Sequence, residues 1–106
     1  GTGTPRREFL HTDDCADACI HLMDRCDGGE IINVGTGEDL TIAETARLLA
    51  DVIGFEGELA IEPSKPDGTP RRLLDVTKLR DLGWTPKVGF VEGLRATYAC
   101  FLESGA

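Results

Sequence analysis

The sequence lacks any apolar run close to the roughly 20 residues that a membrane-spanning helix requires, so it predicts no such helix. Its first residues lack the charged, apolar and small-residue succession of a signal peptide, and we therefore expect a cytoplasmic location. Positive charge is also scarce, because 11 basic residues stand against 19 acidic ones and the net charge is −8. A field of this sign argues against nucleic acid as the main partner, and we expect neither nucleic acid nor membrane to be bound.

Familiar catalytic motifs are missing as well: the chain has no G-x-S-x-G elbow, no P-loop and no H-E-x-x-H pair. The pair Gly1-Thr2-Gly3 has no strand before it, and Gly35-Thr36-Gly37 has no third glycine at the required spacing. We interpret both as turns rather than as a dinucleotide-binding loop. His11, Asp13 and Asp14 offer acid–base groups, but the two aspartates are better explained as N-caps of the helix that follows them.

What remains is an ordinary globular composition, 41% hydrophobic and 28% charged, in 106 residues that fit one domain or a piece of a larger protein. Glycine and proline interrupt the chain often, which predicts an α/β pattern of short strands alternating with helices. The expected strands are 7–12, 31–34 and 58–62, and the expected helices are 14–25, 41–53, 75 or 77 to 82, and 91–102. Thr41 and Glu44 predict a capping box for the second helix, whose apolar side is expected to be buried.

Four cysteines invite two other interpretations. A secreted chain of this size could hold two disulfides, and His11, Cys15 and Cys19, four residues apart, could face a metal ion. The spacing lacks the paired C-x₂₋₄-C and H-x₃₋₅-H groups of common zinc sites, and no fourth ligand is evident. We therefore expect no metal, and reduced thiols buried as small apolar groups, with Cys15, Cys19 and Cys26 in the apolar stripe of the first helix.

The most informative segment is the loop of residues 63–70, Pro-Ser-Lys-Pro-Asp-Gly-Thr-Pro. Its three prolines and Pro-Asp-Gly turn exclude a helix, and they lower the conformational entropy lost when the loop is held in one shape. Positive charge gathers in two places, at Arg6 and Arg7 and again at Lys65, Arg71 and Arg72. Arginine forks at the end of the loop can grip phosphate oxygens, and Asp67 can accept hydrogen bonds from sugar hydroxyls. The loop is thus either a phosphate-and-sugar clamp or a solvated charged surface.

Several segments together resemble the GDP-L-fucose synthases, a family of extended short-chain dehydrogenases. They are Gly-Thr-Gly-Thr-Pro-Arg-Arg-Glu-Phe-Leu-His-Thr-Asp-Asp (1–14), Ile-Asn-Val-Gly-Thr-Gly (32–37), residues 64–77, Leu-Gly-Trp-Thr-Pro (82–86) and residues 92–98. The resemblance runs through the chain in order. Its Arg-Glu-Phe-Leu-His and Asn-Val-Gly-Thr-Gly pieces are shared across extended short-chain dehydrogenases, including nucleotide-sugar epimerases, whereas Ser-Lys-Pro-Asp-Gly-Thr-Pro-Arg is more particular to the fucose synthases.

The resemblance implies an α/β fold, with residues 1–106 as the single C-terminal, substrate-binding part of a Rossmann-type enzyme and the N-terminal dinucleotide-binding domain absent. In that family the whole enzyme epimerises C3 and C5 of GDP-4-keto-6-deoxy-mannose and reduces its C4 ketone with NADPH. The family's glycine-rich turn, its Ser and Tyr-x-x-x-Lys group and its epimerising Cys and His lie in the first two-thirds. Here Tyr98 is the only tyrosine, and Leu102 stands where the lysine would be. We therefore expect no catalytic residue in this chain, no NADP bound to it alone, and no activity alone.

Substrate binding is what the resemblance carries over. Arg7 matches a family arginine that contacts the GDP-sugar, Asp67 matches a substrate-contacting aspartate, and Arg72 stands where many members have lysine. The implied partners are a GDP-sugar substrate, the missing Rossmann domain and a second copy, since homodimers are common in the family. Two other interpretations stay open: the same portion of a UDP- or dTDP-sugar epimerase or dehydratase, and a free-standing, non-catalytic interaction module.

Overall fold

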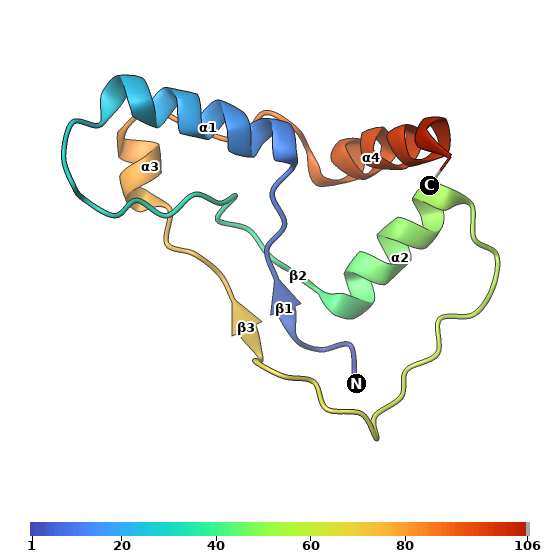
Figure 1. The fold of residues 1–106 in the computed structure, drawn as a ribbon. Helices are drawn as coiled ribbons and strands as arrows, with labels where there is room; N and C mark the ends of the chain where they lie inside the picture. The colour runs from blue at the N-terminus through green and yellow to red at the C-terminus, as the bar shows by residue number, and fades with distance from the viewer. Residues whose placement is uncertain (106) are drawn as a thin grey trace.

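The computed structural model describes residues 1–105 and contains four helices (Figure 1). They are α1 (Thr12–Arg25), α2 (Ile42–Ile53), α3 (Thr77–Asp81) and α4 (Phe90–Ser104). Helix α1 lies beside α3 on one side of the molecule and α2 beside α4 on the other, with the strands between them (Figure 1). Among the helices of residues 1–105, none is long and apolar enough to span a bilayer.

Three two-residue strands connect these halves. The central strand β1 (Arg6–Arg7) pairs antiparallel with β2 (Leu40–Thr41) and parallel with β3 (Arg71–Arg72), in the order β2-β1-β3. In register, Arg6 lies opposite Arg71, and Arg7 lies opposite Arg72. The long segment before β3 sweeps around the outside of the molecule and brings the proline-rich loop back to β1 (Figure 1). The mixed helices and sheet agree with the predicted α/β class.

The helix predictions are confirmed within about two residues, and the capping box of α2 is formed as predicted. The Thr41 amide donates to Glu44 Oε2 at 3.0 Å, and the Glu44 amide donates to Thr41 Oγ1 at 3.1 Å. Gly54 then ends the helix in the left-handed region with φ of 75°. These boundaries follow from local chemistry, which explains why the sequence alone predicts them.

The three strand predictions, by contrast, are wrong or too long. Only Arg7 of residues 7–12 belongs to a strand, and residues 31–34 and 58–62 pair with no strand in the described part of the chain. A strand needs a neighbour for its backbone hydrogen bonds, and β1 is already paired on both edges. Ile31 is 83% exposed, while Ile32 packs against the core from an irregular segment.

The first helix begins earlier than predicted, and this overturns the interpretation of its aspartates as N-caps. His11 is the N-cap, and its Nδ1 accepts from the Asp13 amide at 3.1 Å. Asp14 therefore falls inside the first turn and points inward, where it is 2% exposed. Its carboxylate accepts from the backbone amides of Lys87, at 3.1 and 3.2 Å, and Val88, at 3.0 Å. The buried aspartate thus ties α1 to the segment that leads into α4.

The inward face of α1 is also rotated by one residue from the predicted apolar stripe. Asp14 and Ala18 are its buried residues, whereas Cys15 and Cys19 are exposed. Cys26 is half-buried, Cys100 on α4 is exposed, and all four thiols are free. The prediction of buried thiols is therefore wrong. The helical period was predicted correctly, but Asp14, which accepts from the Lys87 and Val88 amides, determines which residues of α1 face inward.

A single small core lies between α1 and α3. It contains Ala18, Val76, Leu79 and Trp84, with Leu10, Leu22, Ile32 and Val34 packed against it. Within residues 1–105, the half formed by α2 and α4 has no comparable core, although the two helices contact each other. Ile42, Leu49 and Ile53 were expected to be buried and are each about two-fifths exposed.

The molecule is correspondingly open for its size. Its accessible surface is 7552 Å², against about 5,800 Å² for a compact monomer of this mass. The radius of gyration is 16.4 Å, where about 13 Å is typical of a compact domain of this length. Much apolar surface that the sequence marks for burial is therefore left without cover in this chain.

We predict that Asp14→Ala lowers the free energy of unfolding by about 1–3 kcal/mol, because two backbone amides lose their acceptor in a buried position. Urea unfolding measures the change. The matched control is Asp24→Ala in the same helix, since Asp24 is exposed and should change stability by less than about 0.5 kcal/mol. Equal effects of the two substitutions would contradict the role assigned to Asp14.

Candidate functional site

The sheet places four arginines on two adjacent strands, and its register sorts them into two pairs. Successive side chains of a strand point to opposite faces, so Arg6 and Arg71 share one face while Arg7 and Arg72 share the other. Two of the three predicted substrate-binding residues, far apart in sequence, are thus brought side by side. No sequence spacing indicated this pairing, because it depends on the parallel contact between β1 and β3.

The pair Arg6 and Arg71 is occupied by an acidic side chain that the sequence analysis missed. Asp39 accepts from Arg6 Nε at 2.9 Å through Oδ1 and from Arg71 Nε at 2.7 Å through Oδ2. Burial raises the pKa of Asp39, but the hydrogen bonds and charges of Arg71 and Arg6 outweigh it, and the net pKa is lowered. Asp39 follows the Gly35-Thr36-Gly37 turn, and nothing in its local sequence distinguishes it from a solvated turn residue.

The other pair has no acidic partner among residues 1–105. Arg7 is half-buried and donates from Nη1 to its neighbour's carbonyl, Arg6 O, at 2.7 Å. Its Nη2 lies beside the proline-rich loop, 4.0 Å from where a Cβ atom at Gly68 would stand. Arg72 is exposed to solvent. Neither positive charge is therefore paired with a carboxylate within residues 1–105.

Asp67, the third predicted residue, stands next to Gly68 on the same loop and is tethered to the start of the chain. Its Oδ1 accepts from the Thr2 amide at 2.6 Å and its Oδ2 accepts from Thr2 Oγ1 at 2.7 Å. The Thr2 hydroxyl, followed by its amide, lowers the pKa of Asp67. Arg7 thus lies near the residue that follows Asp67, although Arg7 and Asp67 line different pockets. Thr2, which the sequence did not single out, holds the Asp67 carboxylate.

A largely apolar groove of about 670 Å³ lies between β1, α2 and α4, and both Arg7 and Asp39 are among the residues that line it. Its walls include Phe9, Leu40, Leu49, Phe90 and Leu94. The rings of Phe9 and Phe90 are 5.8 Å apart in a tilted arrangement. Arg7 also lines this groove, so the candidate anion site is bounded by an uncovered apolar surface.

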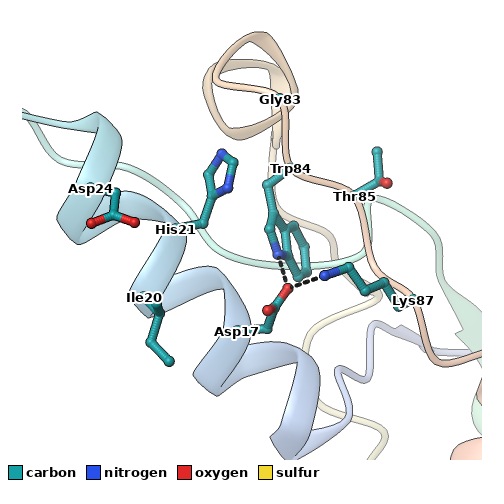
Figure 2. A pocket seen from close by; sticks show the side chains of 8 residues that line it. All are labelled: Asp17, Ile20, His21, Asp24, Gly83, Trp84, Thr85 and Lys87. Atoms are coloured by element: carbon teal, nitrogen blue, oxygen red, sulfur yellow. Dashed lines mark hydrogen bonds and ion pairs between the residues drawn. The ribbon is translucent and has the colours of Figure 1, made fainter.

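A second, shallower pocket of about 240 Å³ lies beside α1 and is shown in Figure 2. Asp17 points into it and accepts from Trp84 Nε1 and from Lys87 Nζ, both at 2.9 Å (Figure 2). His21 stands above, and its Nε2 is 2.6 Å from the Leu82 carbonyl oxygen. Asp17, Trp84, Lys87 and His21 all have partners within the chain, so we assign this pocket to holding α1 against the segment around Trp84.

The other sequence candidates do not form a reactive cluster. His11 serves as the helix cap, and Cys15 and Cys19 are exposed on the helix it begins. Within residues 1–105, no three His, Cys, Asp or Glu side chains come close enough to hold a metal ion. The groups that the predicted site residues offer are therefore the guanidinium groups of Arg7 and Arg72 and the carboxylate of Asp67.

Comparison with known proteins gives matches along the whole chain. The family model described as "NAD dependent epimerase/dehydratase family" matches residues 1–35. The GDP-L-fucose synthase 1 of Arabidopsis thaliana is 55% identical over 98% of this chain and 32% of its own length. The GDP-L-fucose synthase of Escherichia coli K12 is 49% identical over 98% of this chain and 35% of its own length. The chain thus spans about a third of the curated relatives it matches.

Solved structures give the same result for the fold. A GDP-6-OMe-4-keto-L-xylo-heptose reductase from Campylobacter jejuni matches 98% of this chain and 33% of its own, at 38% identity and a TM-score of 0.89. A GDP-mannoheptose C4 reductase from the same organism, with NADP bound, covers 96% of this chain and 33% of its own at 38% identity and a TM-score of 0.87. A UDP-glucose 4-epimerase from Thermotoga maritima, with UDP-glucose, covers 100% of this chain and 34% of its own at 32% identity and a TM-score of 0.88. The predicted α/β fold and the predicted family resemblance are confirmed.

We predict that Thr2→Ala raises the pKa of Asp67 towards its usual value, because one of its two lowering hydrogen bonds is lost. A carboxyl-detected NMR titration measures this shift. Since the pKa of Asp67 is lowered in the folded chain, the tether stabilises the fold above about pH 4 and that contribution is lost as pH falls through the lowered pKa.

Thr69→Ala is the matched control, because Thr69 lies in the same loop and is exposed. This substitution should leave the pKa of Asp67 nearly unchanged. The role assigned to Thr2 would be contradicted if Asp67 titrated at the same pH in the wild type and in Thr2→Ala.

Proposed function

Because the chain is related along its whole length to the GDP-L-fucose synthases, we propose that it forms the part of such an enzyme that binds the GDP-sugar. The observation that carries this proposal is the register of β1 and β3, which sets Arg7 beside Arg72 with no acidic partner in the described chain. The proposed reaction of the whole enzyme is epimerisation of GDP-4-keto-6-deoxy-mannose and its reduction to GDP-L-fucose with NADPH.

The chemistry of the arginine pair suits a diphosphate. Each guanidinium presents a planar fork of donors that matches phosphate oxygens and stays charged at any working pH. Neighbouring strands lie about 4.8 Å apart, so two forks from adjacent strands can reach two linked phosphate groups. On a chain of net charge −8, such a pair is a local attraction for an anion that the surrounding field would otherwise repel.

Asp67 complements the arginines on the sugar side of the diphosphate. Thr2 uses one acceptor position on each carboxylate oxygen. A carboxylate has about four such positions, so about two remain for hydroxyl groups of a ribose. The Thr2 tether also holds the loop in place before the ligand arrives, which lowers the cost of ordering it on binding. We propose that Asp67 binds the ribose of the nucleotide.

The proton- and hydride-transfer groups are proposed to lie in the remaining two-thirds of the enzyme. This part is proposed to be a preceding dinucleotide-binding domain that carries NADP. The bare apolar surface supports an association of that kind: Met23 on α1 is 82% exposed and Ile31 beyond it 83%. Alone, the chain is proposed to bind neither NADP nor NADPH and to catalyse no reaction. A cytoplasmic location and a homodimer of the whole enzyme remain predictions.

We predict that GDP shifts the NMR signals of residues around Arg7, Asp67 and Arg72, and that added salt weakens the binding. Arg7→Gln or Arg72→Gln should weaken GDP binding at least about tenfold, since each removes a charged hydrogen-bonding group. Arg95→Gln is the matched control, because it removes one exposed positive charge from α4 instead of from the sheet and should leave the affinity nearly unchanged.

Absence of binding at millimolar GDP, or signal changes elsewhere, would contradict the proposal. Competition by UDP and dTDP distinguishes the neighbouring family: tighter binding of either would favour the corresponding portion of a UDP- or dTDP-sugar enzyme. Light scattering tests the interpretation as a non-catalytic module. That interpretation requires an ordered, self-associated state that binds no nucleotide.

A further inference from the structure

One buried carboxylate joins the two strands that carry the proposed phosphate-binding arginines. Asp39 directly precedes β2 and uses one oxygen for Arg6 of β1 and the other for Arg71 of β3. Its side chain is only 5% exposed, whereas the two arginine side chains are 41% and 59% exposed. Asp39 thus connects all three strands from one face of the sheet.

This connection answers a physical difficulty of the sheet. Arg6 and Arg71 lie directly opposite each other on neighbouring strands, and like charges so placed destabilise strand pairing. The strands are two residues long, and the Arg6 amide donates one of the few backbone bonds across them, to Pro70 O at 2.8 Å. A ladder this short is not stable by itself. The carboxylate between the two arginines turns a repulsive pair into a bridge.

We propose that Asp39 is the positioning residue of the phosphate site: by bridging Arg6 and Arg71 it fixes the register that sets Arg7 beside Arg72 on the opposite face. This inference rests on the proposed function for the identity of the ligand. The claim that Asp39 fixes the strand register depends only on the contacts within the sheet. Asp39 also separates the roles of the four arginines. Two are held by the internal carboxylate, and the alternation of the strands leaves the other two for the anion.

The decisive variant is Asp39→Asn, because electrostatics and positioning predict opposite changes in it. Removing a negative charge raises the local positive potential, so electrostatics alone predicts tighter GDP binding. Loss of the bridge instead predicts binding about tenfold weaker although Arg7 and Arg72 are intact. Glu30→Gln is the matched control: it removes the same charge from the exposed pair with Lys78, away from the sheet, and should leave GDP affinity within about twofold.

Hydrogen exchange at the Arg6 amide tests the structural half without any ligand. In Asp39→Asn, the Arg6 amide hydrogen should exchange faster than in the wild type. Amides of α1, such as that of Cys15, should keep their protection. Asp39→Glu keeps the charge but displaces the oxygens, so it should show a smaller loss of both GDP affinity and Arg6 protection, and it serves if Asp39→Asn does not fold. Unchanged or tighter GDP binding in Asp39→Asn, or unchanged Arg6 exchange, would overturn the proposal.

Failure of the proposed function has a different signature. If wild type does not bind GDP but Arg6 exchange still accelerates in Asp39→Asn, the bridge stands as the register device of the sheet and the ligand assigned to Arg7 and Arg72 is wrong. If wild type binds GDP and Asp39→Asn binds it equally well, the ligand stands and the positioning role is wrong.

Discussion

A carboxylate shared between two arginines is the interaction on which the central part of this molecule depends. Asp39 holds Arg6 and Arg71 across strands too short to be stable through their backbone bonds alone. The register that results sets the faces of the sheet to which the four arginines point. Arg7 and Arg72 meet on the far face, and the proline-rich loop that carries Asp67 returns to β1 through the Pro70 carbonyl. Remote chain segments become one site because one buried acid links them.

The rest of the chain is stabilised more locally. Asp14 ties α1 to the segment that leads into α4 through two backbone amides, and Asp17 holds the same helix to Trp84 and Lys87 (Figure 2). These buried or half-buried acids explain part of the large negative charge of the sequence: several aspartates bind backbone amides and basic side chains of distant segments. The apolar residues contribute one small core, and the open shape leaves α2 and the outer face of α1 without cover.

Local chemistry made part of this structure predictable. The Thr41 and Glu44 capping box and the glycine after α2 depend on residues close in sequence, and both are formed as expected. Residues 31–34 and 58–62 failed as strands because strand formation depends on a partner that the sequence pattern cannot supply. The phase of α1 failed for a related reason: Asp14 is buried by amides some seventy positions away, and no helical periodicity contains that information.

The candidate site was predictable only as a set of residues. Arg7, Asp67 and Arg72 followed from motif resemblance, and the strand register sets Arg7 beside Arg72. Asp39, which bridges the neighbouring arginines, and Thr2, which holds Asp67, carry no local signal. A crystal structure of the chain with GDP tests the central claim most directly. The account predicts the diphosphate between the guanidinium groups of Arg7 and Arg72, with Asp39 still bridging Arg6 and Arg71. A diphosphate bound by Arg6 and Arg71 in place of Asp39, or bound away from the sheet, would contradict it.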